Sequence, residues 1–321
     1  MLKKATMNCN ILVTGGAGFI GSNICEQLLL LGYNVRCLDN LSNGKMKNIQ
    51  PFLENSNFEF IQGDICDFST CNDAMQGVDY IIHQAAWGSV PRSIAMPVAY
   101  CENNILGFVN ILEAARINKI KRVVYASSSS VYGDDESLIK REGGEGKCRS
   151  PYALTKKMDE EWAKIYAALY DMEIIGLRYF NVFGPKQNPE GQYAAVIPKF
   201  IKTLSKGESP VIYGDGTQSR DFTYVMNVVD ANIKACFASD QAVNRVYNIG
   251  TGTTETVNEI FFLISKELNT EVKAMYDNER RGDVKFSLAD ISLAKEFLDY
   301  DPKWSFAEGL SKTISWYLKE C

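Results

Sequence analysis

The sequence predicts an α/β fold, in which a doubly wound parallel sheet is followed by a smaller α+β domain. Through the first half of the 321 residues, apolar runs of strand length alternate with longer segments of 3.6-residue periodicity. The strand-length runs are rich in Val, Ile and Leu, as parallel strands covered on both faces are. After residue 181 this alternation ends, and turn residues such as Gly184-Pro185 and Asn188-Pro189 introduce shorter, less regular elements.

Each element is expected from the spacing of its apolar residues along the sequence. Strands are expected at residues 10–14, 34–39, 58–64, 79–84, 122–128 and 173–179, with helices at 18–31, 100–118 and 151–170 between them. In the second half, helices are expected at 195–205, 225–239, 256–268 and 306–318, the third beginning with the capping-box pattern Thr256-Val-Asn-Glu259. We therefore expect a first domain over residues 1–180, joined by part of 225–250, and a second over residues 181–321.

Composition excludes several classes of function. A net charge of −5 provides no general basic field for nucleic acid. His83 is the only histidine, so a multi-histidine metal site is impossible, and no metal is expected. No apolar run is long enough to span a membrane, and the short polar start does not resemble a secretory signal. The nine cysteines are scattered without a CxxC pair, which favours reduced thiols and a cytoplasmic location.

A glycine-rich turn follows the first strand directly and precedes a helix. Gly15, Gly18 and Gly21 allow a tight turn and a close approach to a pyrophosphate, which the N–H groups of the helix N-terminus would bind. The second strand ends in Asp39, where a carboxylate can accept hydrogen bonds from ribose hydroxyls and repel a 2′-phosphate. The pattern predicts a Rossmann-type domain that binds NAD rather than NADP. At the end of the third strand, Asp64 and Ile65 could bracket the adenine, or Asp64 could simply cap a turn.

A tyrosine and a lysine open the helix expected at 151–170. Tyr152 and Lys156 are four residues apart and so share one helical face. A phenol is a poor base at neutral pH, but a nearby ammonium favours the phenolate and makes it a usable acid/base. Ser128 belongs to a run of four serines at the carboxyl end of a buried strand, where ligands bind in open parallel sheets. The three side chains together predict proton transfer to or from a bound hydroxyl.

With these motifs in place, the chain resembles the extended short-chain dehydrogenase/reductase family over its full length. Within the family it is most similar to the sugar-nucleotide 4-epimerases, in particular the branch that acts on UDP-N-acetylglucosamine and UDP-N-acetylgalactosamine. The stretches that carry the resemblance are residues 83–93 (HQAAWGSVPRS), 177–185 (LRYFNVFGP), 192–198 (QYAAVIP) and 214–222 (GDGTQSRDF).

The resemblance implies a reaction without net redox. Tyr152, assisted by Ser128 and held by Lys156, would take the proton from the 4-hydroxyl of a UDP-sugar. The C4 hydride would pass to a tightly held NAD, and the resulting 4-keto sugar would turn and recover the hydride on its other face. A homodimer built through the helices at 100–118 and 151–170 is expected as well.

The resemblance also implies binding roles for individual positions. The positions implied for NAD are Gly15, Gly18, Phe19, Ile20, Asp39, Asn40, Asp64, Ile65, Ala85, Asn103, Tyr152, Lys156 and Tyr179, with Phe180 beside the nicotinamide. The positions implied for the UDP-sugar are Gly88, Ser89, Ser128, Ser129, Tyr152, Asn181, Ala195, Val196, Tyr213, Arg220, Arg280, Asp283 and Ser287. Arginines suit this role because a guanidinium pairs with a diphosphate in bidentate fashion.

The reaction must be argued from the site, because the same fold hosts dehydratases and decarboxylases. The related 4,6-dehydratases carry an Asp-Glu pair at the positions of Ser129 and Ser130, and the UDP-glucuronate decarboxylases a Glu at the second. Serine cannot act as that acid or base, which argues against both reactions. A catalytically silent NAD-binding sensor of the same fold would not require Ser128, Tyr152 and Lys156 together.

The resemblance also bears on the substrate, through the size of the residues at the positions that it implies for the sugar pocket. Ala195 and Ser287 are small, and Ser287 stands where enzymes restricted to non-acetylated sugars have an aromatic residue, so an N-acetyl group would fit. UDP-glucose and UDP-galactose remain possible weaker substrates. Trp87 and Lys285-Phe286 depart from the branch pattern. The alternative substrate is UDP-glucuronate, whose carboxylate would need a cation such as Arg92 or Lys285.

Overall fold

The computed structural model describes residues 9–190, 194–279 and 286–320. Its centre is a parallel seven-stranded sheet with the order β12-β7-β5-β4-β1-β2-β3. These strands are β1 (Asn10–Thr14), β2 (Asn34–Asp39), β3 (Phe58–Gln62), β4 (Tyr80–His83), β5 (Arg122–Ser128), β7 (Glu173–Tyr179) and β12 (Arg245–Ile249). The chain moves outward from β1 in one direction and then returns to continue from β4 in the other, which is the doubly wound arrangement expected from the sequence.

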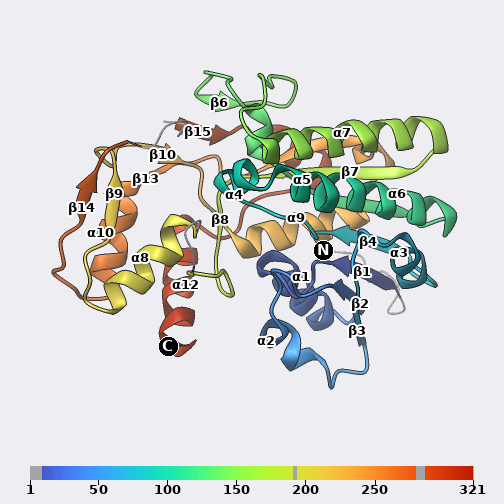
Figure 1. Cartoon of the computed structure of the whole chain (residues 1–321), viewed down its shortest axis with the longest axis horizontal. Coiled ribbons are helices and arrows are strands. Elements are labelled where there is room, and N and C mark those ends of the chain that lie inside the picture. The colour runs from blue at the N-terminus through green and yellow to red at the C-terminus, as the bar shows by residue number, and fades with distance from the viewer. Residues whose placement is uncertain (1–8, 191–193, 280–285, 321) are drawn as a thin grey trace.

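Helices cover both faces of this sheet (Figure 1). On one face lie α1 (Phe19–Leu30) and α9 (Val225–Phe237), which pack against each other; on the other lie α3 (Phe68–Ala74), α6 (Gly107–Ile117) and α7 (Pro151–Tyr170). The strands have apolar side chains on both faces, so the core consists of two clusters separated by the sheet. Short helices complete this part of the molecule: α2 (Met46–Ile49), α4 (Val90–Ala95), α5 (Pro97–Tyr100) and α11 (Ser292–Leu298).

A second, smaller α+β part lies beyond the carboxyl ends of the strands. Its helices are α8 (Val196–Ser205), α10 (Val257–Glu267) and α12 (Phe306–Glu320), which Figure 1 shows on the side away from α3 and α6. Two small sheets pair β11 (Thr223–Tyr224) with β8 (Val182–Phe183) and β14 (Met275–Asp277) with β9 (Val211–Tyr213).

A four-stranded sheet brings distant segments together over the central part of the molecule. Its order is β13-β10-β15-β6, formed by β13 (Glu255–Thr256), β10 (Ser219–Arg220), β15 (Phe286–Ala289) and β6 (Ile139–Lys140). Arg220 is opposite Ser287, and Ala289 is opposite Lys140. Three segments far apart in the sequence therefore present residues to one region.

The structure differs from the expected elements mainly in one helix. Where a continuous helix was expected at 100–118, residues Cys101–Leu106 form a π-helix that leads into α6. α10 has the expected capping box, with reciprocal hydrogen bonds between Thr256 and Glu259. Within the described residues, no helix is long and apolar enough to cross a membrane.

Candidate active site

The glycine turn between β1 and α1 is too crowded for side chains. Gly15 has a φ of +67°, and a Cβ there would lie 2.7 Å from the backbone nitrogen of Ala85. At Gly21, a Cβ would lie 2.2 Å from the carbonyl oxygen of Gly15. The N-terminus of α1 thus meets the turn and the end of β4 without intervening side chains, as the close approach of a pyrophosphate requires.

Asp39, at the end of β2, faces this turn. Its carboxylate accepts hydrogen bonds from the backbone N–H groups of Ala17 (3.0 Å) and Leu41 (2.8 Å). Burial raises the pKa of Asp39, although these two N–H groups lower it. Asp64 contacts the residue that follows Asp39: its carboxylate accepts a hydrogen bond of 2.8 Å from the Asn40 amide.

The turn opens onto a first cavity of about 370 Å³. Twelve of the residues implied for NAD line it: Gly15, Gly18, Phe19, Ile20, Asp39, Asn40, Ile65, Ala85, Asn103, Tyr152, Lys156 and Tyr179. Gly88, implied for the sugar, lies here too. Asp64 is not among the lining residues, and Phe180 is fully buried in the core. The glycine cradle, the Asp39 carboxylate and the other residues that line the cavity fit a dinucleotide.

The N-terminus of α7 positions Tyr152 and Lys156. Ser150 caps the helix by accepting a hydrogen bond of 3.1 Å from the Ala153 N–H, and Pro151 occupies the first turn. The Lys156 ammonium is buried and donates to the Ala126 carbonyl (2.9 Å) on β5. These contacts hold the helix against the end of β5, where Ser128 lies.

Lys156 has a second buried partner, Asp159, one turn further along α7. The ammonium and the carboxylate are 3.1 Å apart, and Asp159 is only 1% exposed. The other carboxylate oxygen of Asp159 has no hydrogen-bond partner among the described residues. Burial raises the pKa of Asp159 to about 7, even though the charge of Lys156 lowers it. An ionisable group thus sits directly behind the lysine.

Tyr152 stands between the first cavity and a central cavity of about 540 Å³. Ser128 lines the central cavity at the end of β5, where it is paired in register with Tyr179 of β7. Tyr152 and Tyr179 line both cavities. A hydroxyl bound in the central cavity would therefore lie on the same side as the Tyr152 phenol, which also lines the first cavity.

An outer cavity of about 270 Å³ continues beyond the central one. Asn181 and Arg220 line both, while Ala195, Val196 and Tyr213 line the outer cavity alone. Three more residues implied for the UDP-sugar line the central cavity: Ser89, Ser129 and Ser287. Arg280 and Asp283, together with Lys285, lie outside the described residues.

Sequence reasoning missed two groups of residues at these cavities. Gln84 and Asn232 fix Tyr179: its hydroxyl is 3.1 Å from Gln84 Oε1, and the Asn232 amide donates to it at 2.8 Å. Lys140, at the end of β6, lines the central cavity although the sequence around it is rich in charged residues. The position of Gln84 at the end of the strand expected at 79–84 was a usable signal. Nothing in the sequence distinguishes Lys140 from a surface lysine.

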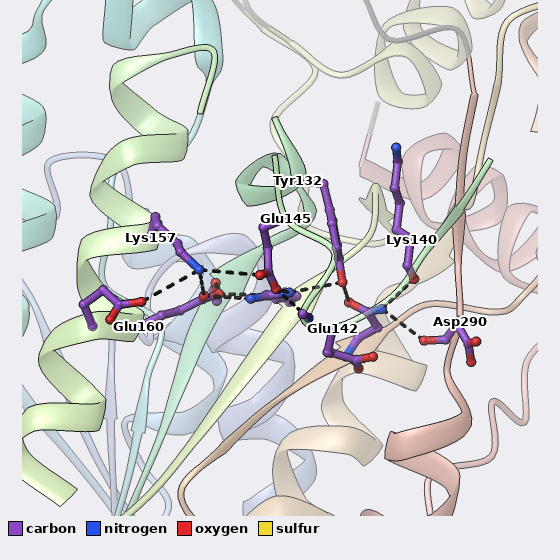
Figure 2. Close-up of polar contacts among 12 residues, drawn as sticks. Tyr132, Lys140, Glu142, Glu145, Lys157, Glu160 and Asp290 are labelled. Carbon is purple, nitrogen blue, oxygen red and sulfur yellow. Dashed lines mark hydrogen bonds and ion pairs between the residues drawn. The ribbon is translucent and has the colours of Figure 1, made fainter. Parts of the chain in front are cut away.

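A buried polar network links these elements beneath the site (Figure 2). Arg178 of β7 donates two hydrogen bonds of 2.8 Å to Glu160 of α7 and also pairs with Glu145. Glu160 accepts a further hydrogen bond of 2.7 Å from Ser127, next to Ser128. The network therefore fixes α7, the end of β5 and the loop that carries Glu145 relative to one another.

Comparison with known proteins agrees with this geometry. Residues 11–250 match the model of the NAD dependent epimerase/dehydratase family. A putative UDP-glucose 4-epimerase of Methanocaldococcus jannaschii is 41% identical, over 95% of this chain and 97% of that protein.

Two solved structures superpose over nearly the whole chain. A UDP-N-acetylglucosamine 4-epimerase from Methanobrevibacter ruminantium M1, in complex with UDP-N-acetylmuramic acid, has a TM-score of 0.92 and 40% identity, with 98% of this chain and 99% of that chain covered. A UDP-glucuronic acid 4-epimerase from Bacillus cereus, in complex with UDP-glucuronic acid and NAD, has a TM-score of 0.90 and 31% identity, with 97% and 100% covered. The chain therefore belongs to the NAD dependent epimerase/dehydratase family of extended short-chain dehydrogenases/reductases, and its cofactor is NAD.

Proposed function

We propose that the protein is an NAD-dependent 4-epimerase that interconverts UDP-N-acetylglucosamine and UDP-N-acetylgalactosamine, with UDP-glucose and UDP-galactose as weaker substrates. The observation that carries the proposal is the position of Tyr152 between a cofactor cavity and a central cavity that continues into an outer one. In this arrangement the reacting sugar occupies the central cavity and the uridine the outer one. The 4-epimerases among the relatives support the reaction.

The side chains of this chain perform the proton chemistry. Tyr152 removes the proton of the 4-hydroxyl, and the Ser128 hydroxyl bridges the two oxygens. Lys156, which is fixed by the Ala126 carbonyl and lines the cofactor cavity, stabilises the phenolate. Bound NAD supplies the acceptor for the C4 hydride and the source from which it returns.

Arg220 provides the charge for the diphosphate. It lies on β10 between the central and outer cavities, where a diphosphate would connect a hexose to a uridine. Because the nucleotide anchors the substrate, neither face of the hexose needs fixed contacts. The 4-keto sugar can therefore turn about its phosphate linkage. The size of the central cavity leaves room for this turn.

The preference for N-acetylated sugars rests on Ser287. Its side chain faces the central cavity from β15, and a small residue there leaves volume for an acetamido group. Ala195 lies in the outer cavity, where we place the uridine, so its small size contributes less to the preference.

The second candidate substrate is UDP-glucuronate, which the Bacillus cereus enzyme binds. The cations considered for the glucuronate carboxylate are Arg92 and Lys285, and Arg92 has other partners. The Arg92 guanidinium stacks over the ring of Trp87 at 4.1 Å and donates a 2.9 Å hydrogen bond to Asn43, and it does not line the central cavity. This arrangement favours the neutral hexoses.

Separate incubations with UDP-N-acetylglucosamine, UDP-glucose and UDP-glucuronate, followed by chromatographic separation of the 4-epimers, test the proposal. We expect the N-acetylated pair to interconvert with the highest kcat/KM. Exclusive turnover of UDP-glucuronate would replace it with the second candidate. Bound NAD without turnover of any UDP-hexose would indicate a silent sensor.

We also propose a homodimer formed through α6 and α7. Several large apolar side chains on α7 are exposed, including Leu154, Ile165 and Leu169, the last at 67%. A second copy of the chain would cover them in a helical bundle. Light scattering coupled to size-exclusion chromatography tests this, and a monomer at micromolar concentration would contradict it.

A further inference from the structure

The central cavity contains a buried cation that the proposed mechanism does not use. Among the described residues that line this cavity, the charged side chains are Arg220 and Lys140. Arg220 also lines the outer cavity and belongs to the nucleotide side, so Lys140 is the cation at the sugar end. Lys140 is only 4% exposed, and a lysine is rarely buried without a specific partner.

The partner of Lys140 is Asp135, in the loop between β5 and β6. The ammonium donates to the Asp135 carbonyl oxygen at 2.6 Å and to its carboxylate at 3.0 Å. Burial raises the pKa of Asp135, but the hydrogen bonds from Ser137 and Lys140 lower it by more, so the pKa lies below its usual value. Asp135 is therefore ionised at neutral pH and balances the charge of Lys140.

One donor of the ammonium is left over. An ammonium carries three N–H donors, and Asp135 accepts from two of them. Among the described residues the third has no partner, and the same holds for the buried Ser130 hydroxyl, which lines the cavity beside Ser128 and Ser129. Unsatisfied polar groups at a cavity are groups that a ligand oxygen can satisfy.

The position of Lys140 is fixed from behind. Its carbonyl accepts hydrogen bonds from the Asn248 amide (2.9 Å) and from the Asp290 N–H (3.0 Å), and Asn248 in turn accepts one from Tyr132 (2.7 Å). Figure 2 shows the Lys140 side chain running away from this network. The same small sheet holds Lys140 and Ser287, so the two line the cavity from adjacent strands.

We propose that Lys140 and Asp135 form a charge-balanced pair that selects a neutral hexose: Lys140 donates one hydrogen bond to a hydroxyl or amide oxygen of the sugar, while Asp135 cancels the field that would attract a carboxylate. This rests on the proposed binding of UDP-hexoses in the central cavity. A lysine without the aspartate would favour a uronate, because its full charge would face the carboxylate.

Ligand binding to variants tests the pair directly. Lys140→Met, Asp135→Asn and the double variant are made in the Tyr152→Phe background, so that ligands are not turned over. Isothermal titration of the NAD-loaded proteins measures Kd for UDP, UDP-glucose and UDP-glucuronate, of which the last two differ only at C6. Arg141→Met is the matched control, because it removes a cation from the next position, where the side chain is 67% exposed.

Each variant has a distinct expected result. Lys140→Met weakens UDP-glucose about tenfold, as for the loss of a hydrogen bond from a charged group, and leaves UDP within about twofold. Asp135→Asn tightens UDP-glucuronate about tenfold and changes UDP-glucose by less than about threefold. The gain for UDP-glucuronate disappears in the double variant, and Arg141→Met changes none of the three ligands.

Other outcomes overturn the inference. Equal weakening of UDP and UDP-glucose in Lys140→Met would show a structural role, and unchanged Kd values for both ligands would show no contact with the hexose. No gain for UDP-glucuronate in Asp135→Asn would refute the charge-balancing role. If the parent protein binds UDP-hexoses yet wild type epimerises none, the proposed function fails while these ratios still decide the role of Lys140. If no UDP-hexose binds more tightly than UDP, both proposals fail.

Discussion

Replacing Asp159 by asparagine should change the pH dependence of folding stability. In the folded protein, burial raises the pKa of Asp159 to about 7 from its ordinary value of 3.8, despite the Lys156 ammonium 3.1 Å away. Because the folded-state pKa is the higher one, the protonated form stabilises the fold at low pH. That stabilisation is lost as the pH rises through about 7. Asparagine stays neutral at every pH and keeps one oxygen for Lys156.

The size of the effect follows from the two pKa values. The difference between 3.8 and about 7 corresponds to about 4 kcal/mol in total, of which about 3 kcal/mol lies between pH 5 and pH 8.5. The unfolding free energy of Asp159→Asn minus that of wild type should therefore increase by about this amount across the interval. An effect of the substitution that does not depend on pH, such as a weaker contact to Lys156, changes this difference equally at pH 5 and at pH 8.5. It therefore does not alter the expected increase.

Urea unfolding followed by circular dichroism at pH 5, 6, 7 and 8.5 measures this difference. Glu161→Gln serves as the control, because it removes a half-exposed carboxylate from the same helix. Parallel curves for wild type and Asp159→Asn would refute the reasoning. A difference that shrinks with rising pH would show that the ion pair with Lys156 outweighs burial.

The remaining predictions concern the reaction, the sugar pocket and the single histidine. Tyr152→Phe should lower kcat by a factor of about 100 to 10,000 while NAD stays bound, as absorbance of the purified protein can show; near-normal turnover would remove Tyr152 as the acid/base. Ser287→Tyr should raise KM for UDP-N-acetylglucosamine about tenfold and leave that for UDP-glucose nearly unchanged, and equal losses would contradict the account of pocket size. Burial, aided by the charge of Lys156, lowers the pKa of His83 to about 3. Neutral His83 therefore stabilises the fold above pH 6.5, and this stabilisation, about 5 kcal/mol in total, is lost as the pH falls toward 3. The one imidazole signal in the NMR spectrum should not titrate between pH 7 and 5, and a midpoint near 6.5 would show that His83 is accessible.

The large sheet was readable from the sequence because its signals are local. The bounds of β1, β2, β5 and β7 agree with the expected strands, since each contains buried apolar residues in a segment of strand length. The start of α7 was equally clear, because Ser150 and Pro151 are a cap and a first-turn residue. The glycine turn and the Tyr152–Lys156 pair are attached to these elements, and the structure places both at the first cavity.

The smaller sheet could not be predicted in this way. β6 and β10 are only two residues long, too short for any period, and each pairs with a segment far away in the sequence. The sequence around Lys140 is rich in charged residues, and the contacts that surround it, with Asp135, Asn248 and β15, come from tertiary structure. The π-helix before α6 contacts α5 and α7, and the 3.6-residue period that predicts a helix there does not distinguish it from an α-helix.

The four-stranded sheet has a consequence for how the protein acquires its binding properties during folding. No two of its paired strands are joined by a hairpin, so every pairing closes a long loop and carries the entropy of that closure. The pairing of β15 with β6 joins Leu288 to Ile139, 149 residues apart, whereas no pairing of the large sheet spans more than 70. Contacts of so large a sequence separation form late. A refolding chain should therefore regain affinity for NAD before affinity for the nucleotide sugar, with an interval in which the dinucleotide is bound and the central cavity is still open.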